Sequence, residues 1–160
     1  MNQSEKFWNK TARKYAKGPI KDMAGYEKTL EDTRKYLGSD KTVLEFGCGT
    51  GTTALKLASS TKDYTATDLS SEMIAIANEK KREQNATNVS FVQATLEDDV
   101  LKEGSYDVIL GYNIVHLLPD PAAALKRIQS LLKPGGVFIS KTACLRESWF
   151  WPLIVPIVAK

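Results

Sequence analysis

Hydrophobic positions along this chain follow two different periods. Residues 4–17 and 25–37 repeat apolar side chains at helical spacing and predict two amphipathic helices. Gly18 and Pro19 end the first helix, and Gly38 is the expected C-cap of the second. Beyond them, short apolar runs typical of strands alternate with helical stretches. The expected strands are 42–46, 64–67, 89–92, 106–111 and 137–141, and the expected helices are 52–59, 70–82 and 121–132.

This alternation predicts a doubly wound α/β fold. Strands separated by helices indicate βαβ units and a mostly parallel sheet, and right-handed crossovers place helices on both faces. Residues 133–136 are expected to form a turn before the fifth strand. Ligands of such sheets bind at the carboxyl ends of the strands. The end of the first expected strand is therefore the place to look for chemistry.

Composition narrows the class of protein. The chain has 160 residues, 42% hydrophobic and 26% charged, which fits one globular domain and excludes a disordered or collagen-like chain. Two cysteines and one histidine are too few for a disulfide scaffold or a closed four-ligand zinc site, so no metal is expected. The polar N-terminus lacks the apolar core of a signal peptide. The cysteine usage favours a reducing, cytoplasmic compartment.

The net charge of +3 is mild but unevenly distributed. Residues 1–41 hold ten Lys and Arg against six Asp and Glu, whereas the remaining residues hold twelve against thirteen. A solvated helix face is the favoured explanation of this basic segment. A surface for nucleic acid or anionic lipid is the alternative.

A glycine-rich loop and two carboxylates mark the predicted ligand site. The segment Glu45–Gly51 follows the first strand, and its glycines let the backbone approach a ligand closely. Asp68 ends the second strand, where a carboxylate can accept hydrogen bonds from ribose hydroxyls. An ordinary strand–helix turn with a helix-capping Asp68 is the alternative interpretation. Together the loop and the acid favour an adenosine-type ligand.

The loop spacing helps to choose among adenosine ligands. It reads G-x-G-x-G, which differs from the dinucleotide fingerprint G-x-G-x-x-G, and Walker-A spacing is absent. The carboxylate of Glu45 would repel a pyrophosphate and favour a cationic ammonium group. S-adenosylmethionine is such a ligand.

Four segments, in order, resemble the motifs of class I S-adenosylmethionine-dependent methyltransferases. Residues 43–51 resemble motif I, residues 67–70 with Met73 are similar to the second motif, and residues 133–136 resemble the turn before the fifth strand. Residues 111–120 resemble the segment after the fourth strand in small-molecule methyltransferases of the ubiquinone/menaquinone-biosynthesis type. The resemblance implies a Rossmann-like fold with strand order 3-2-1-4-5, and S-adenosylmethionine as the cofactor.

The resemblance also implies a division of the chain and a set of roles. A single methyltransferase domain over 1–160 would comprise a helical lid (1–40), a cofactor-binding core (41–145) and an apolar tail (146–160). Glu45 would support the ammonium group, Asp68 the ribose, and Asn113 would lie beside the sulfonium. Thr95 stands where the family usually places an Asp near the adenine. The implied cofactor-binding residues are Glu45, Phe46, Gly47, Cys48, Gly49, Gly51, Asp68, Leu69, Met73, Thr95, Leu96 and Asn113.

Two residues are candidates for a catalytic role. Tyr15 matches the N-terminal helix that the family folds over the cofactor as a lid, which would exclude water; packing on the edge of the sheet is the alternative. His116 follows the fourth strand and could act as a general base near the acceptor. A surface residue at a helix end is the competing interpretation of His116. Cys48 is expected to be a small filler in the loop.

The sequence favours a small-molecule acceptor. Residues 111–114 lack the Asn/Asp-Pro-Pro-aromatic motif of amino-group methyltransferases, and no Pro-Cys dipeptide supports a cytosine-type nucleophile, so no nucleic-acid partner is expected. Two other functions stay open, namely a non-catalytic S-adenosylmethionine-binding module and, less favoured, a nucleotide-dependent oxidoreductase.

The last residues form an apolar tail. Residues 149–159 are too few to span a bilayer, which takes roughly 20 residues, and two prolines interrupt any long helix. A shortened chain, whose missing part would cover this segment, is the favoured expectation. A hydrophobic acceptor site, a weak membrane or lipophilic contact, and a homo-oligomer are the alternatives.

Overall fold

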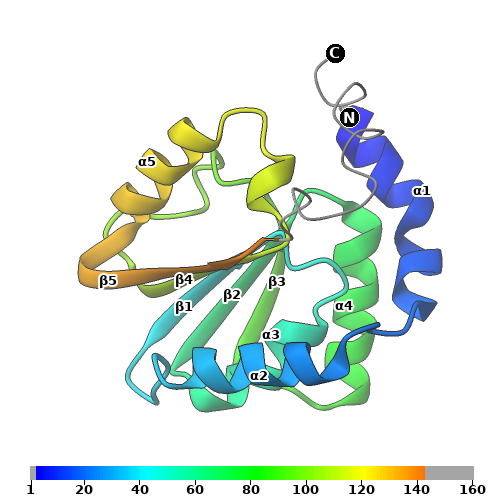
Figure 1. The fold of residues 1–160 in the computed structure, drawn as a ribbon, viewed down its shortest axis with the longest axis horizontal. Helices are drawn as coiled ribbons and strands as arrows, with labels where there is room; N and C mark the ends of the chain where they lie inside the picture. Colours follow the sequence, from blue (N-terminus) through cyan, green and yellow to red (C-terminus); the bar gives the residue numbers. More distant parts are fainter. Residues whose placement is uncertain (1–2, 143–160) are drawn as a thin grey trace.

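The computed structural model describes residues 3–142, in which five parallel strands form one sheet in the order β3-β2-β1-β4-β5 (Figure 1). The predicted doubly wound α/β fold and its strand order are thus confirmed. The apolar tail expected at 146–160 lies outside the described residues. The elements are α1 (Gln3–Lys17), α2 (Met23–Arg34), β1 (Thr42–Phe46), α3 (Thr52–Leu57), η1 (Ala58–Ser60), β2 (Asp63–Asp68), α4 (Ser71–Glu83), β3 (Val89–Gln93), β4 (Tyr106–Tyr112), η2 (Val115–Leu117), α5 (Pro121–Leu131) and β5 (Leu132–Lys141).

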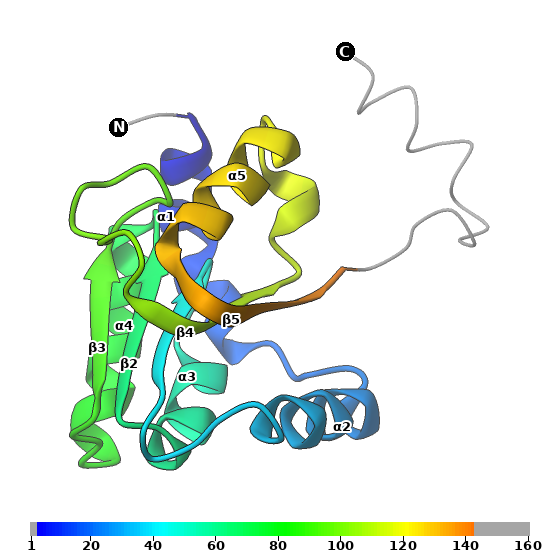
Figure 2. The ribbon, with the colours of Figure 1, turned by 90° about the vertical axis from the view of Figure 1, so that its left-hand side faces the viewer.

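The sheet separates two apolar layers. On one face, Val43 and Phe91 belong to a buried cluster that includes residues of α2, α3 and α4. On the other face, Leu44 and Ile109 pack with the buried residues of α5. Figures 1 and 2 show α5 on one side of the sheet and α2 and α3 on the other. Since β1 and β4 are covered on both faces, their side chains form nearly continuous apolar runs.

Local side-chain caps begin the helices next to the carboxyl edge of the sheet. The Ser70 hydroxyl accepts the Met73 N–H at 3.1 Å at the start of α4. Asp120 accepts the Ala123 N–H at 2.9 Å, and Pro121 occupies the first turn of α5. These caps place both helices where the sequence predicts them, to within one residue.

Two sequence-based boundaries were wrong. Helix α2 ends at Arg34, because the N–H groups of Tyr36 and Leu37 turn back to carbonyls only three residues earlier. Gly38 is therefore not its C-cap. The turn expected over 133–136 lies instead inside β5, where Leu132 already pairs with Tyr106. A register shift after that pair takes up the extra residues of β5.

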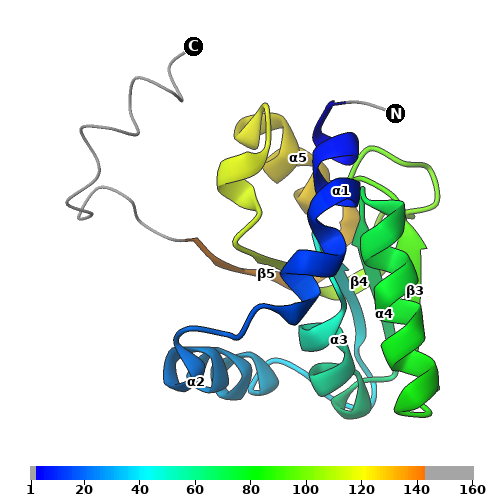
Figure 3. The same cartoon turned by 90° about the vertical axis from the view of Figure 1, so that its right-hand side faces the viewer.

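Helix α1 packs along α4 at the carboxyl edge of the sheet (Figure 3). Ala12 is buried against Met73 and Ile76, with Trp8 and Ala16 beside them. Ser70 Oγ donates to Asn9 Oδ1 at 2.6 Å, which joins α1 to the start of α4. Of the apolar side expected on the first helix, Phe7 and Tyr15 remain exposed. Because these two rings are not part of the core, they are available to a ligand.

A Thr67→Val substitution is expected to raise the free energy of unfolding by about 1 kcal/mol. Within residues 3–142, Thr67 Oγ1 is the buried side-chain oxygen that lacks a hydrogen-bond partner. Valine has nearly the same shape and removes the desolvation penalty of that hydroxyl. Urea denaturation measures the change. Thr61→Val is the control, since its buried hydroxyl donates to Ala58 O at 2.8 Å and its loss should destabilise. Equal destabilisation of both variants would contradict the prediction.

Candidate active site

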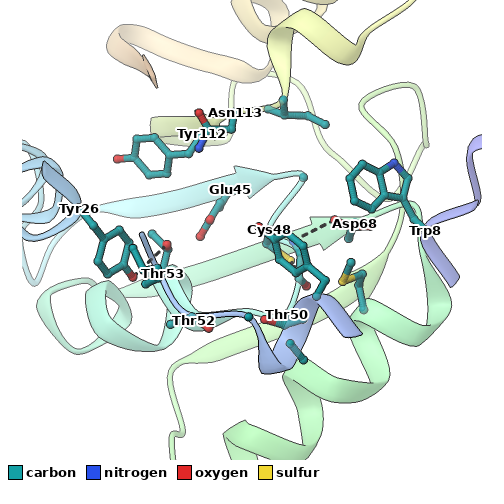
Figure 4. A pocket seen from close by; sticks show the side chains of 18 of the residues that line it. Trp8, Tyr26, Glu45, Cys48, Thr50, Thr52, Thr53, Asp68, Tyr112 and Asn113 are labelled. Carbon is teal, nitrogen blue, oxygen red and sulfur yellow. Dashed lines mark hydrogen bonds between the residues drawn. The ribbon is translucent and has the colours of Figure 1, made fainter. Parts of the chain in front are cut away.

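A cavity of about 800 Å³ opens at the carboxyl ends of β1, β2 and β4, beneath α1 and beside α2. Its size is within the usual range of small-molecule and cofactor sites. Figure 4 shows Trp8 and Asp68 at one end, Tyr26, Thr53 and Tyr112 at the other, and Glu45 between them. The cavity coincides with the switch point, where the connections leave β1 and β4 in opposite directions.

The three glycines of the loop after β1 share a left-handed backbone but face different surroundings. Their φ values are 66° at Gly47, 54° at Gly49 and 73° at Gly51. A Cβ on Gly49 would meet only Tyr15 Cε1, at 3.9 Å, so this glycine leaves room in the cavity. A Cβ on Gly51 would lie 2.6 Å from Phe91 Cε1. Gly51 therefore serves helix–sheet packing, whereas Gly49 serves access to the cavity.

Asp68 ties the end of β2 to the glycine loop. Its Oδ2 accepts the Gly49 N–H and its Oδ1 accepts the Ser70 N–H, both at 2.9 Å. Burial raises the pKa of the Asp68 carboxyl, and these two backbone hydrogen bonds act in the opposite direction. The cap of α4 is Ser70, so Asp68 is not the helix-capping residue of the alternative interpretation. Each oxygen can accept a further hydrogen bond from a ligand.

Glu45 is a buried carboxyl on the floor of the cavity. Glu45 is only 3% exposed, and the Tyr64 hydroxyl donates a hydrogen bond to its Oε2 at 2.6 Å. The pKa of Glu45 is raised to about 7: burial is the main cause, the Tyr64 hydrogen bond lowers the pKa, and the nearby Asp68 carboxyl raises it. A cation in the cavity would therefore meet a carboxyl that has no ion-pair partner among residues 3–142 and whose pKa is close to neutral.

The folded protein is expected to lose stability as the pH rises from about 5 to about 8. Glu45 has an ordinary pKa of 4.5 and a folded-state pKa of about 7, so the native state binds more protons in this window. The contribution of Glu45 to the free energy of unfolding is fully present below its pKa in the unfolded chain and is lost above its pKa in the folded protein. The difference is roughly 3 kcal/mol. Urea denaturation at both pH values compares wild type with Glu45→Gln. A Glu45→Gln variant that loses as much stability as wild type would contradict this account.

Other expected site residues also lie on the cavity wall. Tyr15 lies over Gly49, with its Cε1 3.9 Å from the Cβ position of that glycine, and packs edge-on against Trp8, with ring centroids 6.3 Å apart. Asn113 has a left-handed backbone with φ of 54°, and its N–H donates to Lys141 O at 2.7 Å. The further expected residues on the wall are Gly47, Cys48, Leu69 and Met73. Burial raises the pKa of the Cys48 thiol well above its ordinary value, which agrees with a filler role.

Five expected site residues lie off this wall. Phe46 stacks with Phe138, and Leu96 packs beneath α5, so both belong to the core. Gly51 faces the packing of β3 and α4, as described above. Thr95 is exposed, and both its N–H and its hydroxyl donate to Asp98 Oδ2. His116 is exposed on η2, while its neighbour Leu117 reaches the cavity.

Sequence reasoning missed the end of the cavity opposite Asp68. Tyr26 and Thr53 share a hydrogen bond between their hydroxyls at 3.3 Å, and the Tyr112 hydroxyl is hydrogen-bonded to Thr33 Oγ1 at 2.5 Å. Tyr26 belongs to the helix expected over residues 25–37, and helical spacing by itself indicates packing, not contact with a ligand. A signal was available at Tyr112, because it ends β4 at the edge where ligands bind.

Comparison with known proteins decides the family. A methyltransferase domain model matches residues 44–138, which is more than half of the chain. The chain belongs to this methyltransferase family. The resemblance to class I S-adenosylmethionine-dependent methyltransferases is thereby confirmed at the level of family and fold.

Proteins with similar sequences include bacterial methyltransferases. The chain is 32% identical over 116 residues to a ubiquinone biosynthesis O-methyltransferase of Acinetobacter baumannii strain ACICU, an alignment of 71% of this chain and 49% of the relative. A second such enzyme, from Serratia proteamaculans, is 32% identical over 117 residues, with 72% and 48% covered. The chain thus spans about half the length of the curated relatives it matches.

Solved structures support the same fold. The YcgJ protein of Bacillus subtilis is 27% identical, with a TM-score of 0.67 over 71% of this chain and 50% of that one. Geranyl diphosphate C-methyltransferase of Streptomyces coelicolor is 19% identical, with a TM-score of 0.72 over 85% and 52% of the two chains. At that identity, the second likeness shows the fold alone. None of the helices described within residues 3–142 is long and apolar enough to cross a membrane.

Proposed function

We propose that this methyltransferase domain binds S-adenosylmethionine in the cavity above β1 and β2 and transfers its methyl group to a small molecule. The cofactor, when bound, supplies a methyl group activated by a sulfonium. The observation that carries the proposal is the pair of carboxyl groups, Glu45 and Asp68, which face one cavity across the glycine loop. The names of the relatives as O-methyltransferases of ubiquinone biosynthesis support a small-molecule acceptor.

The residues present fit this cofactor by the chemistry of their donors and acceptors. Asp68 retains acceptor positions for the ribose hydroxyls, and Glu45 offers an anion to the ammonium group. Gly49 leaves the space that a side chain would fill. Leu69 and Met73 provide apolar contact near the Asp68 end, where the adenine would lie.

The other walls would hold and shield the acceptor. Tyr15 and Trp8 on α1 cover the glycine loop, so residues 1–40 would act as a lid over the core 41–145 and exclude water. Positioning the acceptor in line with the methyl–sulfur bond is the main contribution of such a site. His116 is left without a role in this proposal, since its imidazole does not line the cavity. We place the protein in the cytoplasm on its cysteine usage.

The Asp68→Ala variant is expected to bind S-adenosylhomocysteine, the demethylated product, about 5- to 150-fold more weakly than wild type. The substitution removes the acceptor for the ribose and for the Gly49 N–H, a loss of about 1–3 kcal/mol. Isothermal calorimetry measures the affinity.

The control is Asp120→Ala, which removes an exposed helix cap outside the cavity wall and should leave the affinity unchanged. Failure of wild type to bind, or equal affinities for wild type and Asp68→Ala, would reject the assignment.

A further inference from the structure

Tyr64 is a buried residue for which the proposed function has no role. It lies on β2, is 1% exposed, and contributes to the core between the sheet and the helices α2, α3 and α4. Its hydroxyl reaches across to β1 and donates to Glu45 Oε2 at 2.6 Å. A phenylalanine would fill the same apolar space. The hydroxyl therefore requires a reason other than packing.

The hydrogen bond from Tyr64 makes the two oxygens of the Glu45 carboxyl different. Oε2 accepts the hydrogen bond from the Tyr64 hydroxyl, whereas the described residues give Oε1 no donor. The pKa of Tyr64 is raised well above its ordinary value, mainly by burial and next by the Glu45 charge. The hydroxyl therefore stays protonated and acts as the hydrogen-bond donor. The Glu45 side chain lines the cavity (Figure 4). Because Oε2 is hydrogen-bonded to Tyr64, Oε1 is the oxygen available to a ligand.

Within residues 3–142 no cation forms an ion pair with Glu45: Lys14 and Lys141 line the same cavity, but Lys141 Nζ is hydrogen-bonded to Gly25 O and Thr29 Oγ1, and neither lysine is among the groups that shift the pKa of Glu45. The titratable groups that interact with it are Tyr64 and Asp68 from β2, Tyr112 from β4, Tyr26 from α2 and Cys48 from the loop. Burial and Asp68 oppose the charge of Glu45, and the Tyr64 hydrogen bond supports it. Tyr64 is thus the side chain that favours the anionic form before any ligand arrives.

We propose that Tyr64 is a positioning residue: its hydroxyl fixes the Glu45 carboxyl with Oε1 toward the cavity and, together with the incoming ammonium group of the cofactor, holds that carboxyl ionised. This inference rests on the proposed function. It predicts that cofactor binding is linked to loss of a proton from Glu45. Tyr64 would act through Glu45 and touch no ligand itself.

The test is the Tyr64→Phe variant, with binding of S-adenosylhomocysteine followed by calorimetry between about pH 6.5 and 8. Without the hydroxyl, Glu45 is protonated over more of this range. The variant should bind about 5- to 30-fold more weakly than wild type near pH 7, and the deficit should shrink toward pH 8. Methylthioadenosine, which lacks the ammonium group, should bind wild type and variant equally.

Tyr106→Phe is the matched control, because it removes the hydroxyl of another tyrosine of the same sheet, whose ring is buried and which lies outside the cavity wall. It should bind S-adenosylhomocysteine as wild type does at every pH. If Tyr64→Phe also matches wild type at every pH, the positioning role is overturned and the proposed function stands. If wild type does not bind S-adenosylhomocysteine, both are overturned.

A measurement on wild type keeps the inference testable should Tyr64→Phe fail to fold. Binding of S-adenosylhomocysteine near pH 7 should release roughly half a proton, measured from binding enthalpies in two buffers of different ionisation enthalpy. Release should decline toward pH 8, and the Glu45→Gln variant should release none. Wild type that releases no proton near pH 7 would overturn the inference.

Discussion

A Gly49→Val substitution is expected to abolish measurable binding of S-adenosylhomocysteine while the protein stays folded. The backbone at Gly49 has φ of 54°, and a Cβ there points into open cavity with Tyr15 Cε1 as its nearest neighbour at 3.9 Å. A branched side chain would occupy the space where the loop must approach the ligand. We expect at least a 100-fold loss of affinity, together with about 1–2 kcal/mol of backbone strain.

Gly104→Val separates the strain from the blocked cavity. Gly104 has a closely similar φ of 58°, has no atom within 4 Å of its Cβ position, and lies off the cavity wall. Both variants should lose similar stability in urea denaturation, but only Gly49→Val should lose binding in calorimetry. Retained binding by Gly49→Val would show that the loop does not face the ligand.

The neighbouring substitution, Gly51→Ala, is expected to lower the free energy of unfolding by about 3 kcal/mol or more. An added Cβ would lie 2.6 Å from Phe91 Cε1 and 2.8 Å from Ala77 Cβ, on a backbone with φ of 73°. Phe91 and Ala77 are both buried, so neither can move aside without disturbing the core. Overpacking of about 1–3 kcal/mol then adds to backbone strain of about 1 kcal/mol or more.

The matched control is Gly135→Ala, at φ of 79° with no atom within 4 Å of its Cβ position. Gly135→Ala introduces the same backbone strain without a steric clash, so its free energy of unfolding should fall by only about 1 kcal/mol. Denaturant unfolding compares the two variants, and the double variant Gly51→Ala with Phe91→Leu should recover part of the loss. Equal losses of unfolding free energy in Gly51→Ala and Gly135→Ala would contradict the prediction. They would mean that Phe91 on β3 and Ala77 on α4 move aside without loss of stability.

The order and type of the elements, and the edge of the sheet where the site lies, could be predicted from the residue pattern alone. Hydrophobic period is a local property, so buried runs such as Val108–Leu110 and the helices between strands were recognisable without any contact. Parallel pairing and handed crossovers then leave few topologies. Glu45 and Asp68 come directly from strand ends, and parallel strands bring their carboxyl ends to one edge. That is why both were predicted, and both line one cavity.

Other features depend on how the elements pack against one another. Gly49 and Gly51 have similar φ values, so nothing local separates the glycine that faces the cavity from the one that faces Phe91. The end of α2 and the shift within β5 depend on turn hydrogen bonds and on pairing with β4. The hydrogen bond from Tyr64 to Glu45 joins residues 19 apart on neighbouring strands. Burial raises the pKa of Glu45 to about 7, and burial is a property of the surrounding fold, not of the residue.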